Sequence, residues 1–251
     1  MRELIEIRKD EIIPDQTNAL ALQGICPGTR VSANILKLFD RGLEIFAKEA
    51  RPVGMVAAIS GNDFDFVYAG EGRNDTNTPV AEIFRKADHL ALFAVTVGQT
   101  LHDKINELFV AKDFALGSML DSVASVGVEK AADLLEIFFR DGLQREFGVD
   151  GNIAVMRYSP GYCGWHVSGQ RKLFDYLKPE EVGITLRPSY LMEPLKSASG
   201  VIIAGSPEIH VFADTYACCS QCESHSCRQR ISRLVNSTGA SGSGGQPAAM
   251  E

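Results

Sequence analysis

The chain has 251 residues, of which 45% are hydrophobic and 8% aromatic, and its formal net charge at pH 7 is −7. This composition is typical of a globular protein, and the length suits one large domain or two small ones. The negative charge argues against nucleic acid or an anionic membrane surface as the main partner. No apolar run approaches the about 20 residues that cross a bilayer, and residues 1–3 do not begin a signal peptide. We therefore expect a cytoplasmic protein.

The first fifty residues predict one strand and two helices. Residues 2–8 alternate apolar and polar side chains, which is typical of a strand. Residues 17–22 fit a short helix, and residues 31–50 carry apolar side chains at helical spacing. The Arg-Pro pair at residues 51–52 ends this second helix, because the residue before a proline disfavours helical geometry.

The next fifty residues predict a hairpin followed by a buried strand. Residues 55–59 and 64–68 are strand-like runs, joined by the turn-forming residues 60–63. A short helix is expected to begin at Pro79 and to run to about residue 87. The continuous apolar run 90–97 is typical of a buried strand.

A long helical zone occupies the middle of the chain. One helix is predicted from Gly98 to about residue 109, and a second from residue 113 to 147, with apolar side chains three and four apart. Small residues crowd the first half of the second helix. Two alternatives stay open for it: another backbone approaches closely there, or the helix breaks near Gly127.

The last third predicts strands, a turn and a helix. Strands are expected at 153–156, 184–186 and 200–204, where they could share one sheet, and a helix at 170–177. Because helices and strands alternate without a regular βαβ period, the sequence predicts an α+β fold with a mixed or antiparallel sheet.

The segment 157–166 joins the first of these strands to the helix, and its sequence is R-Y-S-P-G-Y-C-G-W-H. Pro160 restricts the backbone, whereas Gly161 and Gly164 allow turns and close ligand approach. Four side chains suited to recognition lie in this segment: Arg157, Tyr162, Trp165 and His166. The alternative is an ordinary Pro-Gly turn with Trp165 in the core.

This segment and those after it resemble the activation domain of cobalamin-dependent methionine synthase. The resemblance rests on R-Y-S-P-G-Y with a nearby histidine, then K-L-F-D-Y-L, G-I-T-L, L-M-E-P and S-A-S-G-V-I-I, in that order within about residues 150–212. It implies a single curved domain over residues 1–212, with a twisted, mainly antiparallel sheet flanked by helices.

The resemblance also implies a ligand and a role. The ligand is S-adenosylmethionine, and the role is reductive methylation of inactive cob(II)alamin. An electron donor such as a flavodoxin or ferredoxin completes such a system. No D-x-H-x-x-G cobalamin motif precedes the matched region. We therefore expect a stand-alone activation subunit, with cobalamin supplied by a partner cobalamin-binding methyltransferase, methionine synthase being the first candidate.

Four residues of the turn match the family's ligand-binding residues. Arg157 matches the arginine that contacts the ligand carboxylate, a group that a guanidinium fork binds well. Gly161 and Tyr162 match the family's glycine and tyrosine, and Ser159 matches a residue that contacts the ligand through its backbone. The alternatives are a solvated strand arginine and, for Tyr162, an amphipathic aromatic at a domain edge.

The acidic half of the family site is only partly matched. Glu136 aligns with a family acid that meets the ligand's positive centre, and Asp133 on the same helix face is the fallback. A second family glutamate falls at Gly151, beside Asp150. Helical acids are often simply solvated, so a non-catalytic adaptor of the same fold stays an alternative.

The remaining residues of the turn are assigned to the contact with the partner or to the protein core. We expect the segment 162–166 to form part of the docking surface, with Trp165 facing the corrin. His166 either meets the corrin or caps the next helix. Cys163 is interpreted as a small buried side chain.

A cysteine-rich segment, residues 213–235, follows the matched region. Its candidate metal ligands are Cys218, Cys219, Cys222, His225 and Cys227. Their number and spacing suit zinc or an iron–sulfur cluster, and the alternative is a set of reduced thiols. An iron–sulfur redox module that delivers electrons to a corrinoid protein is the rival function. Residues 236–251, rich in Ser, Gly and Ala, are expected to be disordered.

Overall fold

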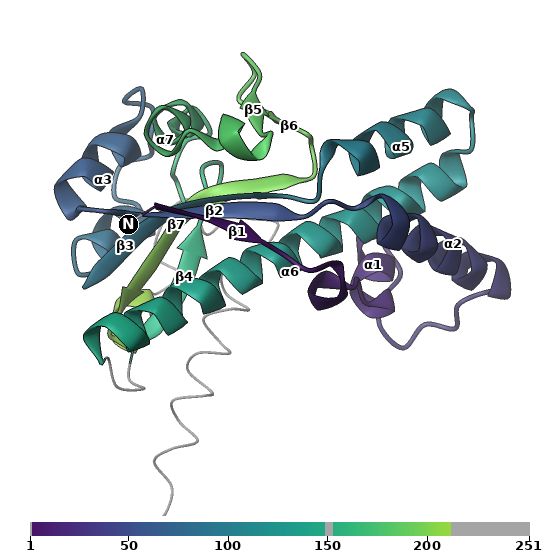
Figure 1. The fold of residues 1–251 in the computed structure, drawn as a ribbon, viewed down its shortest axis with the longest axis horizontal. Helices are drawn as coiled ribbons and strands as arrows, with labels where there is room; N and C mark the ends of the chain where they lie inside the picture. Colours follow the sequence, from purple (N-terminus) through teal and green to yellow (C-terminus); the bar gives the residue numbers. More distant parts are fainter. Residues whose placement is uncertain (1, 149–152, 212–251) are drawn as a thin grey trace, which may run out of the picture.

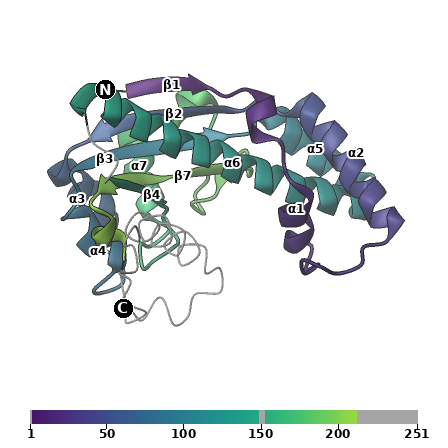
Figure 2. The same ribbon diagram turned by 90° about the horizontal axis from the view of Figure 1, so that it is seen from below.

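A five-stranded antiparallel sheet forms the centre of the protein in the computed structural model, which describes residues 2–148 and 153–211 (Figure 1). The strand order is β1-β2-β3-β7-β4, which Figure 2 shows from top to bottom. The strands are β1 (Arg2–Glu6), β2 (Val53–Ile59), β3 (His89–Thr96), β7 (Ser197–Gly205) and β4 (Ala154–Tyr158). Each neighbouring pair is antiparallel, so the predicted α+β fold with a mainly antiparallel sheet is confirmed.

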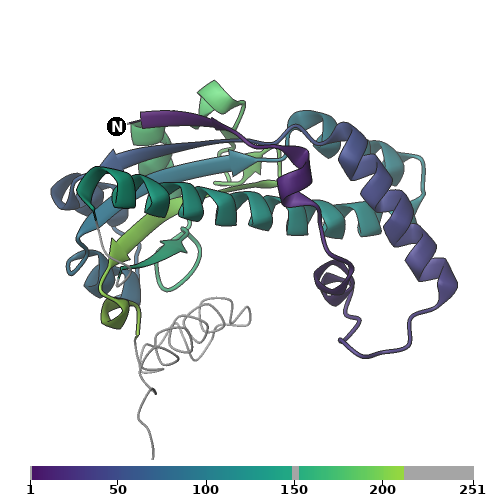
Figure 3. The same cartoon turned by 60° about the horizontal axis from the view of Figure 1, so that its bottom comes forward.

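One face of the sheet is covered by the long helix α6 (Phe114–Phe147). Its N-terminal half extends beyond the sheet, where three more helices pack on it (Figure 3). These are α1 (Gln16–Leu22), α2 (Ala33–Glu49) and α5 (Gln99–Val110). The helix is continuous through Gly127, where an added Cβ would collide with the buried ring of Phe46. The helix therefore does not break at Gly127, and what approaches closely there is the side chain of Phe46 rather than another backbone.

The opposite face is covered by α3 (Gly61–Ala69), α4 (Pro79–Phe84) and α7 (Gly169–Leu177). Strand β3 is buried at seven of its eight positions, because both of its faces are covered. Alternate residues point to opposite faces, so Val56 and Phe93 pack on the α6 side and Met55 and Leu92 on the α3 side. The two clusters form the core on either side of the sheet.

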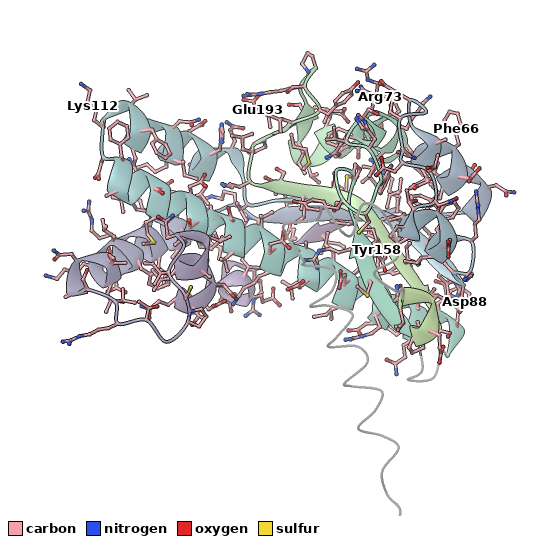
Figure 4. All side chains as sticks on the ribbon, turned by 180° about the vertical axis from the view of Figure 1, so that it is seen from behind. Phe66, Arg73, Asp88, Lys112, Tyr158 and Glu193 are labelled. Carbon is pink, nitrogen blue, oxygen red and sulfur yellow. The ribbon has the colours of Figure 1, made fainter. Side chains whose placement is uncertain are left out.

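The hairpin predicted for residues 55–68 is wrong, because its second half is the helix α3. The Ser60 hydroxyl accepts a hydrogen bond from the N–H of Asp63 and donates one to its carboxylate, at 3.1 and 2.7 Å. This cap begins a helix where a turn was expected. Phe64, Val67 and Tyr68 are buried on one helical face, whereas Phe66 is exposed (Figure 4).

The shared sheet predicted for the C-terminal strands is only partly correct. Strands β4 and β7 pair in the main sheet, but β5 (Thr185–Leu186) pairs with β6 (Met192–Glu193) in a separate two-stranded sheet. Among the described residues, no helix is both long enough and apolar enough to cross a membrane. The predicted cysteine-rich segment and tail lie outside the described residues.

Candidate ligand-binding site

Arg157 lies near the end of β4, at the edge of the sheet. Its neighbours Met156 and Tyr158 point toward α3 and α7, so the pleat turns Arg157 to the opposite face, where α6 lies. Figure 4 shows Tyr158 at the start of the turn that follows the strand. The guanidinium of Arg157 therefore lies beside α6.

Three carboxylates of α6 receive this guanidinium, and we call them the α6 carboxylate cluster: Glu129, Asp133 and Glu136. Nη2 of Arg157 lies 2.7 Å from Glu129, while Nη1 lies 2.5 Å from Asp133 and 3.0 Å from Glu136. Spacings of four and three residues place the cluster on one helical face. Glu136 also accepts the backbone N–H of Arg157 at 2.9 Å, so it fixes both the strand and the side chain.

The members of this site differ in exposure. The Arg157 side chain is only 8% exposed and Glu136 17%, whereas Glu129 and Asp133 are 67% and 58% exposed. Burial alone would lower the pKa of Arg157, but the cluster, led by Glu136, outweighs burial and raises it. Arg157 is thus permanently charged. Among the described residues, three carboxylates around one cation leave a negative excess that faces solvent at Glu129 and Asp133.

The turn after β4 is shaped by backbone hydrogen bonds. The N–H of Tyr162 donates to the carbonyl of Ser159 at 3.2 Å, and the N–H of Gly161 donates to that of Trp165 at 2.7 Å. Gly161 has a φ of 93°, which favours glycine, and Tyr162 is 53% exposed. Gly200 of β7 lies beneath, where an added Cβ would collide with the Tyr158 carbonyl. The small residue in S-A-S-G therefore lets the turn approach the sheet.

The expectation that Trp165 faces a corrin is wrong, because this side chain is core. It is 1% exposed and its ring centroid lies 5.7 Å from that of Phe64 and 5.6 Å from that of Tyr68. The structure favours the capping alternative for His166. Its Nδ1 lies 2.9 Å from the hydroxyl and 3.1 Å from the backbone N of Ser168, just before α7.

The structure brings the described residues of the predicted ligand site close together. Arg157 contacts both Glu136 and the fallback Asp133, and Ser159, Gly161 and Tyr162 follow in the adjoining turn. Sequence reasoning missed Glu129, although it lies four residues before Asp133 on the same helical face. Asp150 and Gly151 lie outside the described residues.

The predicted metal ligands, residues 218–227, also lie outside the described residues. Within residues 2–148 and 153–211, no group of three or more His, Cys, Asp or Glu side chains could hold a metal ion. The predicted metal site stays a prediction.

The fold and the sequence together define a class of protein. A solved structure with the same fold is that of the MetH reactivation domain bound to AdoHcy, with a TM-score of 0.63 and 18% identity. The match covers 94% of this chain and 88% of that one. No curated protein matches the chain. The family model of the vitamin B12 dependent methionine synthase activation domain matches residues 79–230, more than half of the chain. The chain therefore belongs to this activation-domain family.

Proposed function

We propose that this chain binds S-adenosylmethionine and supports reductive methylation of cob(II)alamin held by a partner corrinoid methyltransferase, methionine synthase being the first candidate. The observation that carries the proposal is the position of Arg157. It lies near the end of an edge strand, beside the α6 carboxylate cluster, and precedes a turn with an exposed tyrosine, in a chain of the activation-domain family.

The charges of the site fit this ligand, which has one carboxylate and two positive groups, an ammonium and a sulfonium. The negative excess at the cluster would attract the ligand's net positive charge. The ligand carboxylate would take the place of Glu129 or Asp133 at the guanidinium, because these two are the exposed members. The displaced carboxylate would then form an ion pair with the ammonium of the ligand. Glu136 would stay and orient Arg157 through its second hydrogen bond.

The turn would contribute the remaining contacts. The exposed ring of Tyr162 offers a flat surface for adenine. The carbonyl of Ser159 accepts the N–H of Tyr162 and has a second lone pair for the ligand, and Gly161 leaves open space beside it. When bound, S-adenosylmethionine would supply the methyl group, and a flavodoxin or ferredoxin would supply the electron. The docking surface for the partner would include Tyr162 but not Trp165, which is buried.

Calorimetry with S-adenosylmethionine on the purified chain tests ligand binding. Arg157→Ala is expected to weaken binding by about 1.5–3 kcal/mol, the range for a hydrogen bond to a charged group. Arg171→Ala, an exposed arginine of α7, is the matched control and should bind as the wild type does. Lack of binding to the folded wild-type chain would refute the proposal.

A second measurement tests the role in trans. Mixed with the partner, S-adenosylmethionine and a reductant, the chain should convert cob(II)alamin to methylcobalamin, seen as a change in the visible spectrum. Alone, it should leave free cob(II)alamin unchanged, because methyl transfer needs reacting atoms about 3–3.5 Å apart in a fixed orientation. Equal rates with and without the partner would contradict this role.

One observation favours a second candidate, a non-catalytic adaptor. Arg157 already has three carboxylate partners, so the arrangement could be purely structural. A chain that binds the partner methyltransferase but not S-adenosylmethionine would support the adaptor. The iron–sulfur alternative rests on residues 218–227, and iron and sulfide analysis of the purified chain tests it.

A further inference from the structure

A cavity of about 1000 Å³ lies where α6 ends. It is bordered by the last turns of α6, the end of β2, the start of β3, the start of α3 and the loop after α4. Asp88, in that loop, is labelled in Figure 4. Neither Arg157 nor any member of the α6 carboxylate cluster lines this cavity. It is therefore a different site from the proposed S-adenosylmethionine site.

The walls of the cavity combine apolar and aromatic side chains with polar and charged ones. Phe138, Phe139 and Leu143 of α6 line it opposite Val56 of β2. Phe147, 55% exposed, stacks on the ring of His89 with centroids 4.8 Å apart. A cavity of this size, with several aromatic side chains in its walls, is large enough for a small organic molecule.

Among the described residues, the charged groups that line the cavity have a negative excess. Four are acidic and two basic: Glu3, Asp65, Asp88, Glu146, Arg85 and Arg145. Arg85 is partly neutralised by Asp65 at 3.6 Å. The guanidinium of Arg85 also lies 5.5 Å from the centre of the Phe84 ring, so one aromatic group of this wall already contacts a cation.

We propose that this cavity binds a small organic cation with an aromatic body. The apolar walls would take up the body and the aromatic faces would attract the positive charge. The excess of carboxylates would favour a cation over an anion of the same shape. The proposal does not depend on S-adenosylmethionine binding at Arg157.

Two ions of almost identical shape and opposite charge separate charge from shape, namely tetraphenylphosphonium and tetraphenylborate. In calorimetry at low salt, we expect the cation to bind at least about tenfold more tightly than the anion, since the charged groups that line the cavity have a negative excess. Equal affinity for the two ions, or no binding of the cation, would overturn the proposal.

Variants locate the binding and separate it from the other site. The double change Asp88→Lys and Glu146→Lys affects exposed residues and should abolish the preference for the cation. Glu44→Lys, an exposed change on α2, is the matched control and should preserve the preference. Ala58→Trp should fill the cavity and weaken binding of the cation, with folding verified by circular dichroism.

Arg157→Lys should leave the affinity for tetraphenylphosphonium unchanged. This result would hold even if the chain failed to bind S-adenosylmethionine, so failure of one proposal is distinguishable from failure of the other. Unchanged affinity in Ala58→Trp would place the cation elsewhere and would refute the assignment.

Discussion

Trp165 is buried between α3 and the turn before α7, and its indole N–H finds no acceptor among the described residues. Replacement by alanine should cost about 3–5 kcal/mol of unfolding free energy, as for other large aromatic residues removed from a core. Trp165→Phe should be much milder. The smaller ring loses about 1–2 kcal/mol of burial, but it removes a buried donor whose lack of an acceptor costs about 1–3 kcal/mol. We expect Trp165→Phe to lie between about 1 kcal/mol less stable and about 2 kcal/mol more stable than wild type.

A double-mutant cycle with Gly169 tests the geometry behind this estimate. An added Cβ at Gly169 would collide with the indole nitrogen, so Gly169→Ala should cost about 1–3 kcal/mol in the wild type, the range for overpacking. In the Trp165→Phe background the same change should cost less, because the colliding atom is absent. The expected coupling is at least about 0.5 kcal/mol.

Urea unfolding followed by far-ultraviolet circular dichroism measures all four proteins of the cycle. Fluorescence is an independent check in the wild type, because Trp165 is the single tryptophan of the chain. Its emission should be blue-shifted and poorly quenched by iodide. A cost of under about 1 kcal/mol for Trp165→Ala, or emission typical of an indole in water, would show that the residue is not core.

Three further predictions concern stability. Arg157→Met should lower the free energy of unfolding by about 2–4 kcal/mol. This is below the value for a fully buried pair, because two members of the α6 carboxylate cluster are mostly exposed. Arg171→Met is the control, and an unchanged urea midpoint for Arg157→Met would refute the prediction. Ser60→Ala should cost about 0.5–2 kcal/mol by removing the cap of α3, whereas a neutral result would argue against the cap. Burial raises the pKa of Asp15, but hydrogen bonds from Asn18 outweigh it and lower this pKa below 3.8. The stabilisation by the ionised Asp15 carboxylate is therefore present above about pH 3.8 and is lost as the pH falls through the lower pKa of the folded state. Asp15→Ala should cost about 0.5–2 kcal/mol of unfolding free energy near pH 7, and this cost should shrink near pH 3. A cost independent of pH would contradict this.

The sequence by itself determined most elements and the position of the motif. Periodicity located α2, α5, α6 and β3 within a few residues, because each has a long apolar stripe or run. The ordered segments after residue 150 sufficed to indicate the family that the family model also matches. These signals are local in the chain, so no distant contact is needed to recognise them.

Tertiary structure decided the rest, because the deciding partners are distant in sequence. Residues 64–68 form a strand-like run, but packing against α7 and the sheet buries one helical face of α3. Trp165 is core because the aromatic rings of α3, about a hundred residues earlier, surround it. The guanidinium of Arg157 meets carboxylates that lie 21 to 28 residues before it. The packing of β4 against α6 brings these charges together, and the periodicity of the sequence does not predict which strand packs against which helix.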